Sequence, residues 1–252
     1  MPDRFTKSRP AAPDAYLVEA AGLRWLAAAG PGSASVVEVL EVTPDQLVLP
    51  RLVPARPTRR AAAEFGTALA TTHAAGAPAY GAPPDGWTGD GYIGTQPLSL
   101  RPTDRWGTFY AEQRLLPYAD AATRIGNLSP RGRRLVERVA DRLRAGELDD
   151  DRPPARIHGD LWAGNVIFTA TGVTLIDPAA HGGHGLTDLA MLHLFGAPEL
   201  GTISAAYAGA AGVGPGWQGL IGLHQLHPLL VHAVTHGAGY GAEAEAVAGR
   251  YA

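Results

Sequence analysis

The pattern of hydrophobic and polar positions predicts one helix and a pair of strands in the N-terminal part of the chain. An apolar-rich stretch at 13–29 has a proline and an aspartate in its first turn and a Gly-Pro pair directly after it, as expected of a helix. The β-branched stretch 36–42 and the stretch 46–53 flank the turn residues 43–45, which predicts a β-hairpin. Residues 54–57 carry two prolines and are expected to form a linker.

Helical patterns dominate the rest of the chain. We expect six further helices, at 58–75, 105–121, 129–147, 186–196, 199–211 and 217–250. The segment 76–104 is dense in Gly and Pro and predicts a long loop, whereas 157–176 predicts a loop followed by a hairpin that turns at a Thr-Gly pair. The fold class is therefore α+β, with a few strands and one helix in 1–53 and a mostly helical lobe in 54–252.

Composition narrows the class of protein. Hydrophobic residues make up 46% of the 252 residues, which is enough for a sizeable core, and no apolar run approaches the length of a membrane span. The absence of cysteine excludes disulfides, thiolate metal sites and a cysteine nucleophile. The net charge is −3, and the arginines of 131–144 alternate with acidic residues, so we expect a solvated helix face and no nucleic-acid site. These features favour a soluble cytoplasmic protein that acts on a small molecule or a side chain.

The segment 158–165, with the sequence HGDLWAGN, carries the clearest chemical pattern. Phosphoryl transfer needs a group that accepts the proton of the attacking hydroxyl and ligands for Mg²⁺. Asp160 suits the first role, and Asn165 follows it at the Asp-x-x-x-x-Asn spacing of kinase catalytic loops. We expect the preceding His158 to hold this loop through hydrogen bonds to the backbone.

The predicted hairpin then brings Asn165 and Asp177 to the same end of two paired strands. Mg²⁺ prefers oxygen ligands and takes only one or two from protein carboxylates, with phosphate and water supplying the others. Asn165 and Asp177 are therefore the predicted metal ligands, and Asp160 is the predicted catalytic residue.

These residues resemble the fructosamine kinase (ketosamine-3-kinase) family. The resemblance rests on the segment 158–165, on LIDPA at 175–179 and on DLAMLHLFG at 188–196, and it extends to 90–96, 106–115 and 223–232. It implies a two-lobed, protein-kinase-like fold related to aminoglycoside phosphotransferases and choline kinases.

The resemblance also implies an ATP site. Phe5-Thr-Lys7 is similar to the end of the strand that carries the phosphate-binding lysine, and Glu19 is similar to its helix partner. Such a lysine neutralises phosphates while the glutamate holds its flexible stem. Pro50 and Leu52 fall where the adenine-contacting hinge is expected; the Pro50 carbonyl and the Leu52 amide remain able to hydrogen-bond, since proline lacks only its own donor.

The N-terminus departs from the family pattern. A kinase-type small lobe places a glycine-rich hairpin before the lysine strand, but only six residues precede Lys7 and the first glycine is Gly22. Three explanations are open: a misassigned or truncated start, which we favour; a naturally short enzyme with weakened activity; or a binding-only relative.

Other polar and aromatic residues have less specific signals. His224 and His227, and His232 and His236, are spaced to share a helix face, but no further ligand completes a zinc set, so we expect structural or surface roles. Asp188 is expected to accept backbone amides that shape the catalytic loop, or to cap its own helix. Four aromatic residues are candidates either for an acceptor pocket or for ordinary packing, namely Trp87, Tyr92, Trp106 and Tyr110.

The resemblance implies an ATP- and Mg²⁺-dependent kinase for a sugar–amine adduct. Phosphorylation of a ketosamine's 3-hydroxyl, on a free amino acid or a glycated protein lysine, would destabilise the adduct and restore the amine. One alternative is a kinase for another alcohol, such as an aminoglycoside, which would favour an acidic wall, or a choline-like alcohol, which would favour an aromatic cage. The alternative from another class is a non-catalytic binding protein of kinase fold.

Overall fold

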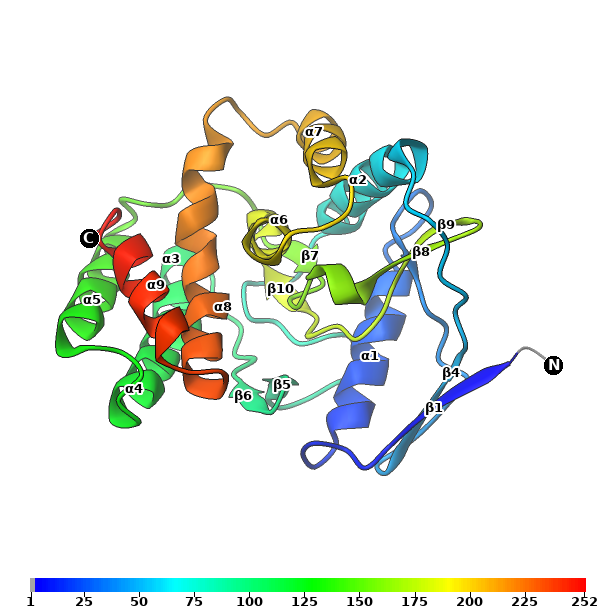
Figure 1. Ribbon diagram of the computed structural model, residues 1–252, viewed down its shortest axis with the longest axis horizontal. Coiled ribbons are helices and arrows are strands. Elements are labelled where there is room, and N and C mark those ends of the chain that lie inside the picture. Colours follow the sequence, from blue (N-terminus) through cyan, green and yellow to red (C-terminus); the bar gives the residue numbers. More distant parts are fainter. Residues whose placement is uncertain (1–2) are drawn as a thin grey trace.

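The computed structural model describes residues 3–252 and has an α+β architecture (Figure 1). At the N-terminal end, strands β1 (Arg4–Ser8), β4 (Gln46–Pro50) and β3 (Glu41–Thr43) form an antiparallel sheet in that order. Helix α1 (Ala15–Ala27) packs against this sheet, as predicted for 13–29. The residues buried between them are Tyr16, Ala20, Leu23, Val37, Leu47 and Leu49.

The predicted strand at 36–42 is wrong in its first half. Strand β2 (Ser35–Val36) pairs in parallel with β9 (Gly172–Leu175), which belongs to another sheet, and the Val37 amide donates to the Leu175 carbonyl at 3.0 Å. The Leu40 amide then donates to Val48 at 2.9 Å, so the chain crosses from one sheet to the other within this segment. Burial of Val37 favours the crossing, because it places an apolar side chain beneath α1.

The middle of the chain contains helices around one short hairpin. Thr58 caps α2 (Arg59–Ala74) by accepting from the Ala61 amide, as predicted. The expected loop at 76–104 contains the hairpin of β5 (Gly91–Ile93) and β6 (Gln96–Leu98). The helices that follow are α3 (Trp106–Phe109), a π-helical turn (Tyr110–Leu115), α4 (Leu116–Arg124) and α5 (Pro130–Ala145).

The π-helical turn holds the β5–β6 hairpin. The Gln113 amide group bonds both the amide and the carbonyl of Arg101, and Arg114 donates to the Ser99 carbonyl at 2.9 Å. One turn later, the Tyr118 hydroxyl donates to the Pro97 carbonyl at 2.6 Å. The long loop is therefore fixed by side chains of the large lobe, which is why it is ordered despite its Gly and Pro content.

The C-terminal half carries the predicted catalytic hairpin and four helices. Strand β7 (Ala155–Ile157) leads into the catalytic loop, β8 (Val166–Thr169) pairs with β9 as predicted, and β10 (His181–Gly183) returns to pair with β7. The helices are α6 (Gly185–Phe195), α7 (Leu200–Ala211), α8 (Ile221–Thr235) and α9 (Ala238–Ala248). The single helix predicted over 217–250 is wrong, because Gly237, at φ 117°, ends α8 before α9 begins.

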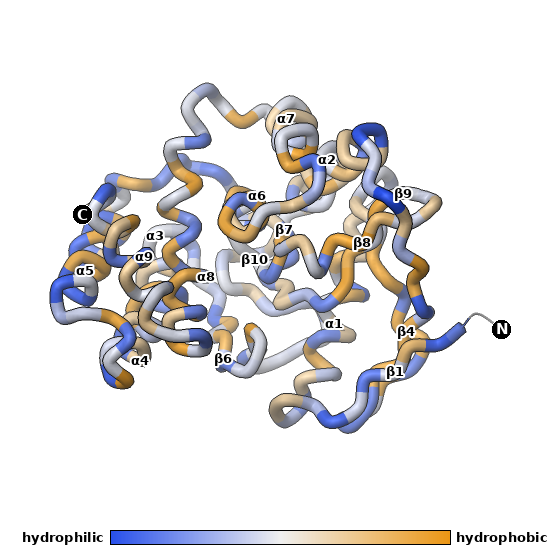
Figure 2. Tube along the Cα trace, in the orientation of Figure 1, coloured by the Kyte–Doolittle hydropathy of each residue, from blue (hydrophilic) through white to orange (hydrophobic). Residues whose placement is uncertain are grey.

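Two apolar clusters form the core of the large lobe. One joins the α3–α5 region to α8 and α9, and the other lies among α2, α6, α7 and the β8–β9 hairpin. Figure 2 shows hydrophobic positions along β4, β8 and α6. Within residues 3–252, no helix combines the length and the apolar character needed to cross a bilayer.

Six of the nine histidines are buried, and several of them pack against one another and against aromatic rings in this core. The His184 and His224 rings lie 4.5 Å apart between centroids, and the Trp106 ring lies 4.9 Å from His224. Burial lowers the pKa of His181 to about 3 and lowers the pKa values of His224 and His227 well below their ordinary value. These imidazoles are therefore neutral in the folded protein.

Because these pKa values are depressed, the stability they contribute is present above the unfolded-state pKa of about 6.5 and is lost as the pH falls. Each such histidine lowers the free energy of unfolding by up to about 1.4 kcal/mol per pH unit below that value. His227→Phe removes one proton-binding group from the unfolded chain, so urea unfolding between pH 7 and 5 should show a shallower pH dependence. Equal slopes for the parent and His227→Phe would contradict this assignment.

Candidate active site

The catalytic loop follows β7 and depends on a glycine. Gly159 has φ +81°, and a Cβ at this position would overlap the Ala179 carbonyl, so a larger residue would force the loop away from its neighbour. His158 is buried and holds the loop as predicted: its ring bonds the Ile176 carbonyl at 2.9 Å and accepts from the Asp160 amide at 3.2 Å. Burial lowers the pKa of His158, which suits a neutral ring that both donates and accepts.

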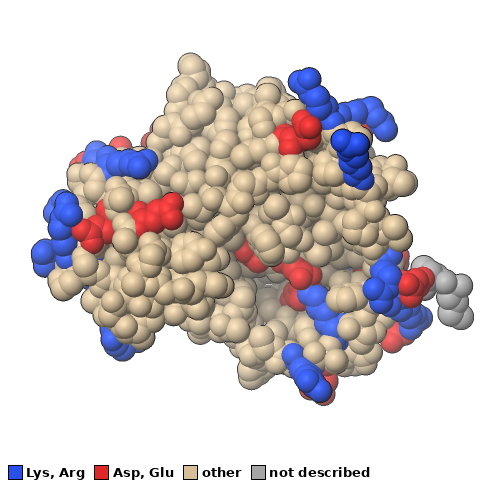
Figure 3. All heavy atoms as spheres, in the orientation of Figure 1, with Lys and Arg blue, Asp and Glu red and all other residues tan. Residues whose placement is uncertain are grey.

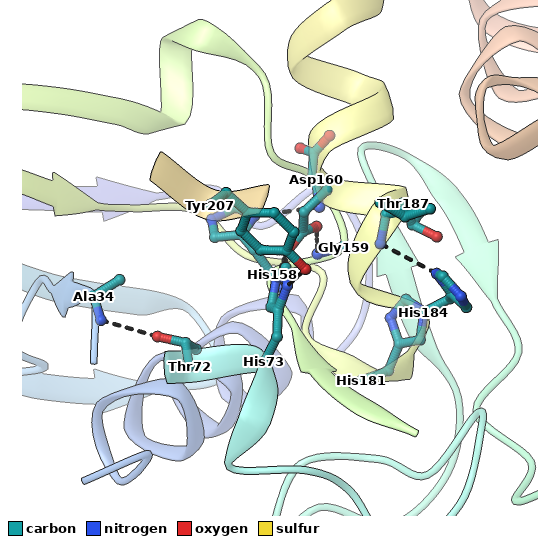
Figure 4. Close-up of polar contacts among 12 residues, drawn as sticks. Ala34, Thr72, His73, His158, Gly159, Asp160, His181, His184, Thr187 and Tyr207 are labelled. Atoms are coloured by element: carbon teal, nitrogen blue, oxygen red, sulfur yellow. Dashed lines mark hydrogen bonds and ion pairs between the residues drawn. The ribbon is translucent and has the colours of Figure 1, made fainter. Parts of the chain in front are cut away.

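A buried carboxylate fixes the start of this loop. Asp188, in the first turn of α6, accepts from the His158 and Gly159 amides at 2.8 Å each, which confirms the first of its two expected roles. His73 of α2 bonds the same carboxylate at 3.0 Å, and the Tyr207 hydroxyl of α7 bonds the other His73 ring nitrogen at 2.8 Å. Figure 4 shows Tyr207 and His73 on one side of the loop, with Asp160 pointing away from them.

This network keeps Asp188 ionised. Burial opposes its charge, but the hydrogen bond and charge of His73, with the His158 ring and amide, outweigh burial and lower the pKa of Asp188. A carboxylate that accepts several hydrogen bonds in a buried site is a rigid anchor, because releasing any donor would leave it unpaired.

The structure brings the three predicted residues of the phosphoryl-transfer pattern together. The Asn165 side-chain amide donates to the Asp160 carbonyl at 2.8 Å, to the Asp160 carboxylate at 3.3 Å and to the Asp177 carbonyl at 3.3 Å. The β8–β9 register, with Val166 opposite Leu175, produces this convergence. Asp177 has φ 55°, a left-handed conformation that turns its side chain at the end of the hairpin.

Lys7 joins this group from the N-terminal sheet. Its ammonium nitrogen lies 2.7 Å from a Glu19 carboxylate oxygen and 2.7 Å from one of Asp177. Burial favours the neutral amine, but the two carboxylates outweigh it and raise the pKa of Lys7. Burial raises the pKa of Glu19 even though Lys7 attracts its charge. The predicted Lys7–Glu19 pair is thus present as a contact, and Asp177 is a further partner that the sequence did not indicate.

The pKa of the Asp160 carboxyl group lies closer to neutral pH than that of an ordinary aspartate. Burial is the largest influence and raises its pKa to about 6; the charges of Asp177 and Asp188 add to this, and the hydrogen bond from Asn165 opposes it. A carboxylate with such a pKa is a better proton acceptor near pH 7 than an exposed one.

Pro50 and Leu52 lie apart from this cluster. Pro50 is opposite Arg4 at the far end of β4, three residues beyond Leu47, the partner of Lys7, or about 10 Å along the strand. The Arg51 amide donates to the Asp3 carbonyl at 2.8 Å, so the Pro50 carbonyl points away from β1. Half-buried Leu52 packs against the cluster beneath α1.

Two cavities meet at Asp160. The first, of about 350 Å³, has Lys7, Glu19 and Asp177 in its wall, together with Tyr92 and Pro178, and we call it the lysine cavity. The second, of about 470 Å³, is the histidine cavity, and its wall comprises Ile93, Gly94, Thr95, Asp160, Trp162, Met191, Phe195, Val231, His232, Thr235, His236 and Tyr240. Asp160 lines both cavities, and so does Gly94, which lies near the tip of the β5–β6 hairpin. Figure 3 shows a hollow in this face with acidic and basic atoms beside it.

The aromatic lining differs from what the sequence indicated. Trp106 and Tyr110 are buried in the core, and Trp87 packs against it, so ordinary packing is the correct alternative for these three. Of the four, Tyr92 alone lines one of the two cavities that meet at Asp160. The helical spacing of His232 and His236 indicated a shared face, but not that this face lines the histidine cavity. Trp162 is 44% exposed, and its ring lies over Gly164, where a Cβ would overlap the indole.

The donor atoms suit a magnesium ion better than a transition metal. Among residues 3–252, no group of three or more His, Cys, Asp or Glu side chains is arranged to hold a metal. Asn165 uses its amide nitrogen for the protein, which leaves its oxygen available, and only one Asp177 carboxylate oxygen is paired with Lys7. Two hard oxygen donors beside a cavity fit an ion that takes its remaining ligands from phosphate and water.

Comparison with known proteins gives a consistent result. A family model described as fructosamine kinase matches residues 4–251. A "Probable ketoamine kinase" from Synechocystis is 39% identical over 149 residues, covering 57% of this chain and 47% of that protein. The mouse protein named ketosamine-3-kinase is 33% identical over 138 residues, covering 54% of this chain and 43% of its own length. The chain thus spans about half the length of these curated relatives.

Solved structures agree on the fold. A crystal structure from Thermobifida fusca, provisionally described as a fructosamine-3-kinase, superposes with a TM-score of 0.89 at 44% identity, covering 98% of this chain and 85% of that one. A choline/ethanolamine kinase family protein from Mesorhizobium loti gives a TM-score of 0.60 at 18% identity, covering 97% and 82%. The expected α+β, protein-kinase-like fold is therefore confirmed.

Asp188→Asn tests the anchor of the catalytic loop. In Asn, an NH2 group replaces one of the two carboxylate oxygens, so a hydrogen-bond donor lies against the donors that the oxygen had accepted from. A buried polar group is then left unpaired, and the free energy of unfolding should fall by about 3 kcal/mol. Asp45→Asn, in the exposed turn between β3 and β4, is the matched control and should change it by less than about 0.5 kcal/mol. A loss below about 1 kcal/mol for Asp188→Asn in chemical denaturation would show that the network is not an anchor.

Proposed function

Since the chain belongs to the fructosamine kinase family, we propose that it transfers a phosphoryl group from ATP to a hydroxyl of a ketosamine. The acceptor hydroxyl is the 3-hydroxyl of the sugar moiety, and the phosphorylated adduct then breaks down to release the amine. The observation that carries the proposal is the position of Asp160, in the wall shared by the lysine cavity and the histidine cavity.

Asp160 is the catalytic residue in this proposal. A hydroxyl that lies in the histidine cavity and points to Asp160 can pass its proton to the carboxylate as its oxygen attacks phosphorus. The raised pKa favours this role, because the carboxylate is ionised at neutral pH yet basic enough to accept a proton. The Asn165 amide fixes the carboxylate, and Asp188 fixes the backbone on which it stands.

The lysine cavity is the phosphate side of the site. Lys7 supplies positive charge for the phosphates of ATP, and Glu19 holds its stem in place. Asn165 and Asp177 would hold Mg²⁺, which when bound neutralises charge on the transferring phosphates. Pro50 and Leu52, at the end of β4, would contact the adenine through the free carbonyl and the amide.

The histidine cavity is the acceptor side of the site. The indole of Trp162 offers a face for a sugar ring, and His232, His236 and Tyr240 offer polar groups for hydroxyls on the opposite wall. Among the described residues that line this cavity, Asp160 is the single carboxylate. A polycationic aminoglycoside would favour a more acidic wall, so the lining supports a ketosamine acceptor instead.

Asp160→Ala should abolish ketosamine-dependent ATP consumption while leaving Mg-ATP affinity within about threefold of the parent, because the carboxylate acts on the acceptor's proton. The matched control is Glu243→Ala, an exposed carboxylate on α9 away from both cavities, which should keep full activity. Turnover of Asp160→Ala within tenfold of the parent would remove Asp160 from the mechanism. If the parent protein binds Mg-ATP but consumes none of it with any alcohol acceptor, that result would support the non-catalytic alternative.

Trp162→Ala tests the acceptor side separately. Loss of the stacking face should raise KM for the ketosamine by about tenfold, equivalent to about 1.4 kcal/mol, and leave KM for ATP within twofold. Trp162→Phe keeps an aromatic face and should recover most of the affinity. Steady-state kinetics with each substrate varied in turn measure both constants, and an unchanged ketosamine KM in Trp162→Ala would place the acceptor elsewhere.

A further inference from the structure

The lysine cavity contains one cation that is paired with no carboxylate of the described residues. Lys7 lies between Glu19 and Asp177, and the positive charge of its ammonium is thereby balanced. Arg9 also lines this cavity. Its guanidinium takes part in none of the ion pairs or side-chain hydrogen bonds that connect residues 3–252.

Two other arginines in or directly beside the N-terminal sheet are paired. Arg4 lies 3.1 Å from Glu41, and Arg51 lies 2.8 Å from Asp3, although all four side chains are largely exposed. Arg9 is exposed as well, so exposure alone does not decide whether an arginine in this region is paired. Within residues 3–252 Arg9 has no acidic partner, which leaves its charge available to a ligand.

The backbone at Arg9 is held in an unfavourable conformation. Arg9 has φ 67°, and it precedes Pro10, which further restricts the residue before it. Five non-glycine residues of the described chain have positive φ, and two of them, Arg9 and Asp177, line the lysine cavity. Strained residues of this kind concentrate at ligand sites, where the surrounding structure over-determines them.

We propose that Arg9 is a binding residue for an anionic oxygen group of a substrate that enters the lysine cavity beside Lys7. A guanidinium binds phosphate or carboxylate oxygens through two parallel hydrogen bonds, which an ammonium cannot match in geometry. Two sources carry this chemistry: the terminal phosphate of ATP, and the carboxylate of a glycated free amino acid. The inference rests on the proposed function for the identity of these ligands.

The experiment measures binding by calorimetry, so that it does not depend on turnover. The parent, Arg9→Met and Arg9→Lys are each titrated with Mg-ATP, with a ketosamine that carries a free carboxylate, and with a ketosamine of the corresponding amine that lacks it. Met keeps the Cβ and the approximate length, so the backbone strain at this position is unchanged. Arg24→Met, an exposed arginine of α1 that lines neither cavity, is the matched control.

Arg9→Met should weaken the binding of one of the two anionic ligands by about tenfold. The affinity for the ketosamine that lacks a carboxylate should stay within twofold of the parent's. Weaker binding of Mg-ATP identifies the phosphate as the partner of Arg9. Weaker binding of the ketosamine with a carboxylate identifies that carboxylate as the partner. Arg9→Lys should restore only part of the loss, and Arg24→Met should bind like the parent. Unchanged binding of both anionic ligands, or equal weakening of all three ligands, overturns the proposal. A parent that binds these ligands in an Arg9-dependent way without transferring phosphate would overturn the proposed function alone.

Discussion

The buried carboxylate of Asp188 is the constraint on which the active site depends. It joins four parts of the large lobe: its own helix α6, the catalytic loop through two amides, α2 through His73, and α7 through Tyr207. The side chains of Asp188, His73 and Tyr207 line neither the lysine cavity nor the histidine cavity. Their effect is to define where the backbone of Asp160 stands, because the loop cannot move without leaving a buried charge unpaired.

A second constraint links the N-terminal sheet to the catalytic hairpin. Lys7 on β1 reaches Asp177 at the end of β9, and β2 pairs with β9 only a few residues before the chain returns to β4. The ion pair and the parallel pairing therefore fix the strand that carries Lys7 against the hairpin that leads to Asp177. Asp177 therefore makes two contacts, an ion pair with Lys7 through its carboxylate and a hydrogen bond from Asn165 to its backbone carbonyl. Its left-handed backbone allows one residue to make both.

Local sequence patterns predicted most of the elements and the central site. The spacing of Asp160 and Asn165, and the strand pairing that carries Asp177 back to them, are short-range features, so sequence was sufficient to bring them together. The partner of β2 was missed, because it is set by burial of Val37 under α1 and not by the residues of the strand itself. The break at Gly237 was missed because a single glycine does not end every helix. His232 and His236 were assigned structural or surface roles, because their relation to Asp160 depends on how α8 packs against α6, and only the tertiary structure contains that information.

In the proposed function, one carboxylate at the wall between two cavities directs the phosphoryl group of ATP onto a sugar hydroxyl. The most direct test is the structure of the product. The purified protein is incubated with Mg-ATP and a ketosamine, and the product is examined by phosphorus and proton NMR. We expect a phosphomonoester at the 3-hydroxyl of the sugar moiety, followed by release of the free amine. An intact, unphosphorylated ketosamine, recovered from a protein that binds Mg-ATP, would contradict this expectation.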